Sequence, residues 1–424
     1  MIDKRILEFV LTDQQDEIAL RASEKLCERG EVGLIDLDSP QAQVVIGVRR
    51  SGKSTLCYQA LKKAGVKFAF VDFDDERLAK ISSEQLNDVL EVLYKINGDF
   101  QYLFLDEIQN IEGWHLFVNR LLRRKMHVIV TGSNAKLLSG ELATHLSGRN
   151  KEIILYPFSF REYCDALGVE TGRKSTIEEA ARRNAFDDYM KTGGFPELIT
   201  IKDNKSYIKD LIGNVLVRDI EQRYKIAYKA AFEELANHLL NNTPTIISYK
   251  DLSELFKIRS IHTVKNYVDY LKQAFILIGV YRYSTKSRLR LTQEKIYPID
   301  VAFMNRRNNA FAGDNLGFRL ETIVLIHLKR KCFREDMDVY YFNERNSECD
   351  FVVCKGNKVV QAIQVSFNIS SEKTLKREIK GLTMVADKTK CDNLLLLTDC
   401  VRDIIKVGDK TIEVKPVYDW CLEL

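Results

Sequence analysis

The chain has 424 residues, which predicts two to four domains at the usual size of roughly 100 to 200 residues per domain. Hydrophobic residues make up 45% and charged residues 29% of the chain, so it can bury substantial cores and is not a disordered polypeptide. Lys and Arg number 64 against 60 Asp and Glu, a net charge of +4 that is too small to indicate a nucleic-acid partner by itself. Any basic surface must therefore be local.

The sequence predicts neither a membrane span nor a signal peptide. The longest aliphatic runs, such as residues 394–397, fall far short of the roughly 20 apolar residues that a spanning helix needs. Glu8 and Asp13 interrupt the stretch where a signal peptide would have its apolar core. The nine cysteines include no C-x-x-C pair, which argues against a zinc site and a disulfide framework. We therefore expect a cytoplasmic protein with reduced thiols and no membrane partner.

Helical stretches and short β-branched or aromatic runs alternate after a helical opening near residues 5–29. The runs lie at residues 44–46, 68–73, 102–105, 128–131 and 153–155. That alternation predicts an α/β fold with a parallel sheet. From residue 160 to about 228 the pattern becomes helical and charged, interrupted by Gly193-Gly194-Phe195-Pro196, which must form a turn. We expect a helical lid or connector in this region.

A phosphate-binding motif directly follows the first of these strands. Residues 47–55 read Gly-Val-Arg-Arg-Ser-Gly-Lys-Ser-Thr, the full pattern G-x-x-x-x-G-K-[ST], with a helix expected after it. The glycines allow backbone N–H groups and the helix N-terminus to face the phosphates of ATP, while Lys53 reaches the β and γ oxygens and Ser54 ligates Mg²⁺. The expected nucleotide-binding residues are Gly47, Arg49, Arg50, Ser51, Gly52, Lys53, Ser54 and Thr55.

Two adjacent carboxylates end the strand at residues 102–105. Asp106 is expected to hold Mg²⁺ through water, and Glu107, which points the other way, to polarise the water that attacks the γ-phosphate. The alternative is a solvated acidic turn. Ser133 and Asn134 follow the strand at residues 128–131 and are candidates for a sensor of the γ-phosphate or the water, with Asn134 preferred; the alternative is ordinary turn chemistry.

Several segments together resemble a known protein family. The P-loop with its double arginine and the Leu105-Asp106-Glu107 segment look like those of prokaryotic AAA-type ATPases that carry a C-terminal restriction-endonuclease-like domain of unknown function. Further matching segments are Thr131-Gly132-Ser133-Asn134, Leu146-Ser147-Gly148-Arg149, Tyr156-Pro157-Phe158-Ser159-Phe160 and Gly193-Gly194-Phe195-Pro196-Glu197. The resemblance covers nearly the whole chain.

The resemblance implies a catalytic role for Arg149. In such ATPases an arginine just before the last sheet strand can reach the γ-phosphate of a neighbouring subunit, and Arg149 occupies that place. An arginine that acts in trans implies a homo-oligomer. The alternative is that Arg149 neutralises a helix C-terminus or forms a surface ion pair. Arg49 and Arg50 have two alternative roles in the same way: they contact either the phosphates or the lid.

A winged helix with a basic wing is expected between residues 231 and 300. The pattern is two helices joined by a short turn, followed by two strands, and Lys265 and Asn266 would face outward from the second helix. The segment between the two strands carries a cluster of cations, namely Arg282, Lys286, Arg288 and Arg290. Such a cluster suits contacts to the backbone of double-stranded DNA. The alternative is a domain connector or a protein-docking site.

The C-terminal region has the helix, hairpin and strand order of a restriction-endonuclease-like domain. Magnesium nucleases of this class need an Asp on one strand and, on the next strand, an acid and a lysine two residues apart. Asp350 fits the first place, and Glu321 lies on the preceding helix. Gln364 and Ser366 stand in the second place, so the acid has become an amide and the lysine is missing. We therefore expect a degenerate nuclease site of Glu321, Asp350 and Gln364.

Two roles remain open for this degenerate site. In the first, Gln364 lends a carbonyl oxygen to a metal ion, Lys373 or Lys376 replaces the missing lysine, and the domain cleaves nucleic acid. In the second, Asp350 only satisfies polar partners, and the domain serves in binding or as a scaffold.

The expected architecture is a P-loop NTPase parallel sheet with a helical lid, a central winged helix and a C-terminal restriction-endonuclease-like α/β domain. The expected boundaries are 1–160 for the ATP-binding domain, 161–230 for the lid, 231–300 for the winged helix and 301–424 for the nuclease-like domain. We expect Mg²⁺-dependent ATP hydrolysis that rearranges the C-terminal region and acts on nucleic acid. The alternatives are a nucleotide-gated regulator that binds DNA or protein, and an ATP-dependent nuclease.

Overall fold

The structure is a computed structural model that describes the chain except residues 1, 22–23, 25, 134–145, 147, 173–174, 285–292, 307–314 and 345–346. The chain divides into two compact units. The first comprises Met1–Leu155 and Gln273–Phe275, and the second comprises Tyr156–Lys272 and Ile276–Leu424. The main division therefore falls directly after the last strand of the first unit.

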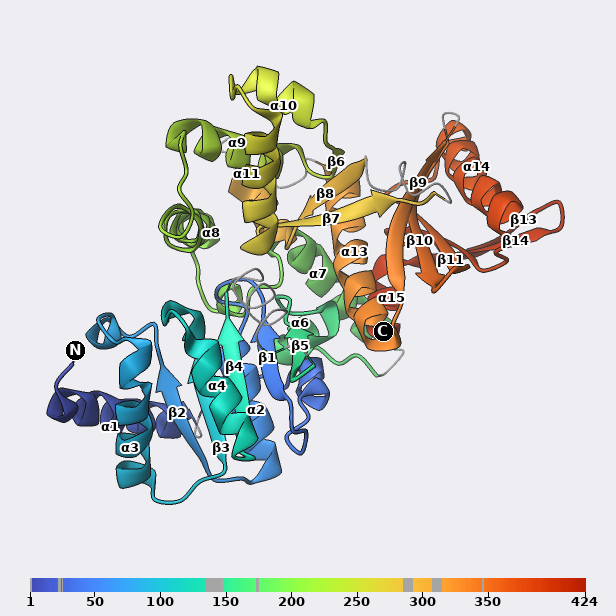
Figure 1. Cartoon of the computed structure of the whole chain (residues 1–424). Coiled ribbons are helices and arrows are strands. Elements are labelled where there is room, and N and C mark those ends of the chain that lie inside the picture. The colour runs from blue at the N-terminus through green and yellow to red at the C-terminus, as the bar shows by residue number, and fades with distance from the viewer. Residues whose placement is uncertain are drawn as a thin grey trace. The chain divides into compact units, whose positions relative to one another are not determined.

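The first unit is built on a five-stranded parallel sheet (Figure 1). Its strands are β1 (Ala42–Ile46), β2 (Phe68–Asp72), β3 (Tyr102–Asp106), β4 (His127–Gly132) and β5 (Asn150–Ile154). Its helices are α1 (Lys4–Leu20), α2 (Lys53–Ala64), α3 (Leu86–Asn97) and α4 (Trp114–Arg123), with short helical turns η2 (Gly30–Leu34), η3 (Glu76–Leu78), η4 (Ser83–Gln85) and η5 (Ile108–Asn110). The α/β fold with a parallel sheet, predicted from the alternation of the sequence, is confirmed.

The strand order brings the motifs of the first unit to one edge of its sheet. The order is β2-β3-β4-β1-β5, and all neighbours are parallel. In this register Val45 lies beside Thr131, and Asp72 beside Asp106. Because parallel strands end at the same edge, the loop after β1 and the acids after β3 share that edge. All residues of β1 are buried, and all except Gln43 are apolar, as expected of a strand covered on both faces.

The second unit joins a helical region to a mixed sheet (Figure 1). Its helices are α6 (Phe160–Leu167), α7 (Thr176–Thr192), α8 (Asn204–Asn214), α9 (Lys229–Asn242), α10 (Tyr249–Leu255), α11 (Ile261–Gln273), α13 (Leu316–Glu335), α14 (Glu372–Thr389) and α15 (Val417–Glu423). Shorter helical segments are η6 (Pro196–Ile199), η7 (Val215–Glu221) and η8 (Val301–Arg306).

Nine strands of the second unit form one sheet in the order β13-β14-β12-β11-β10-β9-β7-β8-β6. They are β6 (Thr245–Ile246), β7 (Leu277–Arg282), β8 (Glu294–Pro298), β9 (Asp338–Glu344), β10 (Ser347–Lys355), β11 (Lys358–Ser366), β12 (Leu394–Thr398), β13 (Asp403–Val407) and β14 (Lys410–Pro416). The hairpin of β7 and β8 continues into the C-terminal strands, because Tyr281 of β7 pairs in parallel with Tyr340 of β9. The segments expected at 231–300 and 301–424 therefore share a sheet.

Buried polar contacts fasten the segment that follows Leu155 inside the second unit. The N–H of Phe158 donates to the carbonyl oxygen of Gly194 at 2.6 Å, and the hydroxyl of Tyr189 donates to the carbonyl oxygen of Phe158 at 2.7 Å. The guanidinium of Arg330 donates to the carbonyl oxygen of Pro157. The sequence segments around Pro157 and Gly194 are thus packing partners of each other.

Gly193→Ala is expected to destabilise the second unit by about 3 kcal/mol. Gly193 has a φ of 85°, and an added Cβ would lie 1.9 Å from Oδ1 of Asp300 and 2.7 Å from the Cβ of Ala302. Asp300 cannot easily yield, because its carboxylate accepts the N–H of Gly194 at 3.0 Å and the N–H of Ala302 at 2.8 Å. The free energy of unfolding should be measured by urea denaturation.

The fluorescence of buried Trp420 in a Trp114→Phe background would report unfolding of the second unit alone, because the chain has only these 2 tryptophans. Gly213→Ala in α8 is the matched control, since an added Cβ there meets nothing within 4 Å. Alanine is the better helix former by about 1 kcal/mol, so the control should be at least as stable as wild type. Equal losses in both variants would contradict the packing role of Gly193.

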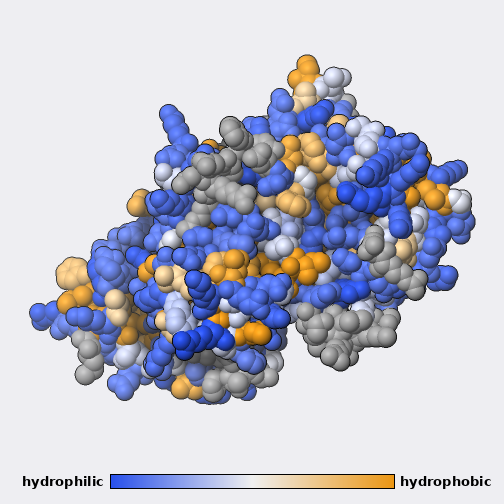
Figure 2. All heavy atoms as spheres, turned by 90° about the horizontal axis from the view of Figure 1, so that it is seen from above, coloured by the Kyte–Doolittle hydropathy of each residue, from blue (hydrophilic) through white to orange (hydrophobic). Residues whose placement is uncertain are grey.

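Hydrophilic residues dominate the face drawn in Figure 2, where hydrophobic residues form small groups. Among the helices of the described residues, none combines the length and apolar composition that a membrane span requires. The 20-residue helix α13, for example, carries Arg319, Glu321, His327 and Arg330 among its buried residues. These side chains have polar partners within the second unit.

Candidate functional site

The loop between β1 and α2 leaves the N-terminus of α2 open to a ligand. Gly52 is the N-cap residue with a φ of 93°, and among the described side chains none caps the helix. The Nζ of Lys53 donates to the carbonyl oxygens of Gly47 and Val48, at 3.2 Å each. The first N–H groups of an α-helix have no partner within the helix and carry partial positive charge. This loop therefore has the chemistry of a phosphate site.

Gly47 packs the loop against the end of the first unit. An added Cβ at Gly47 would lie 2.2 Å from the carbonyl oxygen of Leu155. The N–H of Leu155 in turn donates to the carbonyl oxygen of Ile46 at 2.7 Å. The first glycine of the motif is thus required by close packing as well as by the turn.

Carboxyl groups lie at the ends of the neighbouring strands β2 and β3, where Asp72 is half-buried and Asp106 is buried. The hydroxyls of Ser54 and Thr131 both hydrogen-bond the carboxylate of Asp106. Burial, and then repulsion from Glu107, raises the pKa of Asp106. Burial, and then Asp106, raises the pKa of Asp72 to about 7. A divalent cation would lower both values, and these carboxylate and hydroxyl oxygens are the donors that Mg²⁺ prefers, so Ser54 and Asp106 fit the ion.

Glu107 faces the lysine of the loop. Its backbone is left-handed, with φ 49° and ψ 39°. One carboxylate oxygen, Oε1, lies 3.6 Å from Nζ of Lys53, and the other, Oε2, accepts the N–H of Ser133 at 3.3 Å. The amide of Gln109 also donates to Oε2. The structure therefore brings Lys53, Asp106, Glu107 and Ser133 together, as the sequence led us to expect.

The remaining predicted residues of the loop have varied surroundings. Arg49 pairs with Asp74 at 2.9 Å, and Arg50 is exposed with a φ of 65°. Ser51 is buried, and its hydroxyl has no hydrogen-bond partner among the described residues. Thr55 is half-buried on α2. Arg49 thus has a carboxylate partner within the first unit.

Arg149 is exposed immediately before β5. Its N–H donates to the carbonyl oxygen of Leu146, and its carbonyl oxygen accepts the N–H of Ala42, both at 2.8 Å. Its backbone is therefore fixed while its side chain faces solvent. Other predicted residues lie outside the described residues, namely Asn134 and the wing cations Lys286, Arg288 and Arg290.

Sequence reasoning missed the contribution of Arg29. Its guanidinium donates to the carbonyl oxygen of Ser51 at 2.7 Å and lies 4.0 Å from the carboxylate of Glu31. The side chain is only 2% exposed. It supports the phosphate loop through the main chain. No local pattern marks this role, because its partner lies 22 residues further along the sequence.

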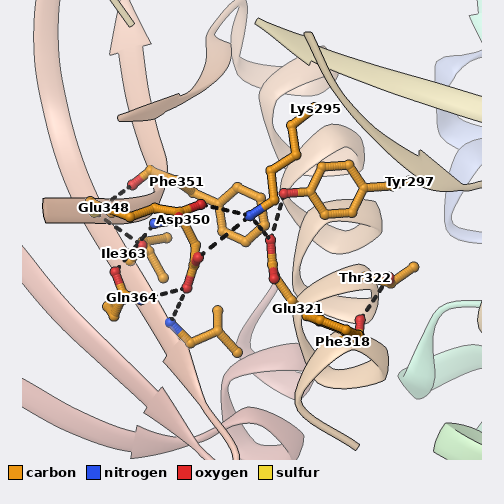
Figure 3. Close-up of polar contacts among 12 residues, drawn as sticks. Lys295, Tyr297, Phe318, Glu321, Thr322, Glu348, Asp350, Phe351, Ile363 and Gln364 are labelled. Carbon is orange, nitrogen blue, oxygen red and sulfur yellow. Dashed lines mark hydrogen bonds and ion pairs between the residues drawn. The ribbon is translucent and has the colours of Figure 1, made fainter. Parts of the chain in front are cut away.

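A second polar cluster lies in the second unit (Figure 3). The Nζ of Lys295 lies 2.8 Å from Oε1 of Glu321, 2.9 Å from Oε1 of Glu348 and 3.9 Å from Oδ1 of Asp350. The hydroxyl of Tyr297 donates to Glu321 at 2.6 Å. A cavity of about 560 Å³ adjoins these residues. The cluster combines β8, α13 and β10.

Gln364 does not direct its carbonyl oxygen to a shared metal position. Its Nε2 donates to Asp350 at 2.8 Å and to Glu378 at 2.7 Å, while its Oε1 accepts the N–H of Asp350 at 3.3 Å. Glu321 is engaged by Lys295. The degenerate set expected from the sequence is thus satisfied by protein partners, and within the described ranges no group of three or more His, Cys, Asp or Glu is placed to hold a metal ion.

The lysine of this second cluster comes from β8 and not from α14. On α14, Lys376 is exposed and pairs with Glu372 at 2.6 Å. Lys295 was overlooked because its partner Glu321 lies 26 positions later, on another element. The available signal was the pair Lys295 and Tyr297, which stand two residues apart and therefore lie on one face of the strand.

Comparison with known proteins gives the following matches. Residues 39–164 match the family model of an AAA domain, and residues 183–313 match a domain of unknown function. An uncharacterized protein of Methanocaldococcus jannaschii is 33% identical, over 100% of this chain and 96% of its own length. An uncharacterized protein of Haemophilus influenzae is 28% identical, over 91% of this chain and 95% of its own length. The Walker-type ATPase of Pyrococcus abyssi has a TM-score of 0.40 at 16% identity, covering 67% of this chain and 97% of that one.

Proposed function

The chain belongs to the same family as the Methanocaldococcus jannaschii relative and carries an AAA domain, and on that premise we propose that it is a Mg²⁺-dependent ATPase. One observation carries the proposal. Lys53, Asp106 and Glu107 converge at one sheet edge, beside the N-terminus of α2, which none of the described side chains caps. A cation, a buried carboxylate with a hydroxyl partner, and a second carboxylate are the groups that phosphoryl transfer to water requires.

Each residue of this site has a distinct role. Lys53 and the first N–H groups of α2 bind the β- and γ-phosphates, which replace the carbonyl oxygens that Lys53 contacts without nucleotide. Ser54 and Asp106 would hold Mg²⁺, and the ion would supply positive charge against the phosphate oxygens. Glu107 polarises the attacking water, while the N–H of Ser133 orients its carboxylate. Because the phosphates compete for Lys53, nucleotide binding frees Glu107 from its pairing with that ammonium.

Changes at the phosphate loop reach the second unit through a short covalent link. Within the first unit, Leu155 packs on Gly47 of the loop. Within the second unit, Phe158 is bonded to Gly194. Only Tyr156 and Pro157 separate these two anchored positions, so the link has little slack. ATP hydrolysis would therefore rearrange the winged-helix and C-terminal regions relative to the first unit.

Helices α9, α10 and α11 followed by β7 and β8 support the proposal of a winged helix within residues 231–300. On α11, Val264 and Val268 are buried, whereas Lys265 and Asn266 are exposed. This exposed face suits backbone contacts to double-stranded DNA. Exposed Arg149 supports a homo-oligomer in which it acts in trans. A nucleotide-gated regulator that docks a protein is the alternative.

The order α13, β9, β10, β11, α14 and β12 supports a restriction-endonuclease-like frame for residues 301–424. A binding or scaffold role suits this frame better than cleavage. Gln364 holds Asp350 through its amide nitrogen, and Ser366 replaces the lysine expected on β11. Lys295 meanwhile engages Glu321.

Double-stranded DNA is expected to stimulate ATP turnover more than single-stranded DNA or RNA does. In fluorescence anisotropy, Lys265→Ala should weaken duplex binding and reduce the slope of log affinity against log salt by about 1, because one phosphate contact is lost. Exposed Lys205 on α8 supplies the control variant Lys205→Ala, which should leave both quantities unchanged. Turnover that responds to no polymer would refute the nucleic-acid role and favour a protein partner, while leaving the ATPase proposal intact.

A further inference from the structure

The cluster around Lys295 has an ammonium group at the centre of three carboxylates. Glu321 on α13 and Glu348 on β10 lie 2.8 and 2.9 Å from its Nζ, and Asp350 on β10 lies at 3.9 Å (Figure 3). We propose that Lys295 is a tethered cation that occupies a latent divalent-cation site formed by Glu321, Glu348 and Asp350. While Lys295 is in place, these carboxylates do not form a metal-binding group, in agreement with the geometry of the described residues.

Burial makes the central charge necessary. The side chains of Lys295, Glu321 and Asp350 are 9%, 8% and 9% exposed. Buried carboxylates without a compensating cation are strongly destabilising. Burial alone lowers the pKa of Lys295, but Glu321 and then Asp350 raise it above its ordinary value. Lys295 therefore stays charged near neutral pH, and displacement of the side chain, not its titration, opens the site.

The adjoining cavity offers space and a further donor atom for a ligand. Its volume is about 560 Å³, well above the roughly 30 Å³ that one water occupies in the liquid. Ser347 lines this cavity, is 6% exposed, and has a buried hydroxyl oxygen with no hydrogen-bond partner among the described residues. Buried polar atoms of native proteins are normally satisfied, so this hydroxyl is available to a ligand or water in the cavity. A hydrated divalent cation has the right size and charge.

The lysine and the carboxylates lie on different elements. Lys295 stands on β8, whose sheet neighbours are β6 and β7, whereas Asp350 stands on β10 and Glu321 on α13. A shift of β8 relative to α13 would therefore withdraw the ammonium from the carboxylates. Without such a shift, the ammonium group of Lys295 keeps a divalent metal ion in the cavity away from Glu321 and Glu348.

Lys295→Met tests the proposal with Mn²⁺ as the probe. Titration of the full-length protein without nucleotide, followed by electron paramagnetic resonance, should show one added Mn²⁺ site. The Kd of this site for Mn²⁺ should be at least tenfold lower than the Kd of any wild-type Mn²⁺ site that is lost on replacement of Asp350. Adding Asp350→Asn to Lys295→Met should abolish the gain. Mn²⁺ held weakly near Asp106 is common to all variants and cancels in the comparison.

Lys272→Met is the matched control. Lys272 is also partly buried and bridges two carboxylates, Glu294 of β8 and Asp269, at 3.0 and 2.9 Å, but it lies outside the cavity lining. This variant should gain no Mn²⁺ site. Lys295→Gln keeps hydrogen bonding without the charge and should reproduce the gain if Lys295→Met does not fold. The proposal would be overturned if wild type and the folded Lys295 variants bound Mn²⁺ equally tightly, or if none of them bound it.

Discussion

Lys53→Ala is expected to reduce ATP turnover at least about 100-fold while leaving the fold intact, because it removes the cation placed to neutralise charge on the phosphates. Lys53 is buried at the start of α2, with its ammonium group on the carbonyl oxygens of Gly47 and Val48. After Lys53 is truncated to alanine, water can enter the loop and hydrogen-bond these two carbonyl oxygens, so the fold should persist. Phosphate release from Mg²⁺-ATP measures the loss, and far-ultraviolet circular dichroism reports the fold.

Lys63→Ala supplies a matched control for this variant. Lys63 lies on the same helix, but it is 69% exposed and pairs with Glu28 at the surface. An exposed ion pair contributes no more than about 1 kcal/mol to stability, so this variant should turn over ATP at the wild-type rate. Undiminished turnover by Lys53→Ala would show that the chemistry lies elsewhere in the chain.

Glu107→Gln should bind ATP but hydrolyse it at least about 100-fold more slowly, since an amide cannot polarise the attacking water as a carboxylate does. The glutamine retains an oxygen that can accept the N–H of Ser133. Removal of the negative charge also ends its repulsion of Asp106 and of the incoming phosphates. The Kd for ATP should therefore stay equal or fall. Equilibrium binding and single-turnover hydrolysis measure the two quantities separately.

The neighbouring Glu112→Gln provides the corresponding control. Glu112 is exposed in the turn that precedes α4, so loss of its charge should change neither the Kd for ATP nor the turnover. Loss of ATP binding in Glu107→Gln, in parallel with the loss of turnover, would assign Glu107 to binding instead of chemistry. A trapped nucleotide in Glu107→Gln together with weak binding in Lys53→Ala would separate the two roles.

The sequence identified the phosphate site because its parts are local. The loop, its lysine and the helix that follows occupy consecutive positions at residues 47–64, and Asp106 directly ends an apolar strand. Such patterns reflect backbone constraints that act over a few residues. The alternation of strands and helices likewise predicted the parallel sheet, because each short apolar run needs cover on both faces.

Contacts between distant positions required the tertiary structure. Arg29 supports the main chain of Ser51, and Lys295 reaches Glu321, yet no repeated spacing links either pair. The missing lysine of the C-terminal region was sought on α14, where nearness in sequence suggested it. The lysine that contacts Glu321 in the structure is Lys295 of β8, because the parallel pairing of β7 with β9 brings the preceding hairpin into the C-terminal sheet.

The sequence by itself determined that this protein has an α/β sheet with a phosphate loop and two acids at the end of a strand. Only the tertiary structure decided that Glu107 pairs with Lys53, that Leu155 packs on Gly47, and that an ammonium fills the acidic cluster of the second unit. The physical reason is that local motifs follow from the torsional and hydrogen-bonding preferences of adjacent residues. The partners of buried charges, by contrast, depend on which strands become neighbours in the folded chain.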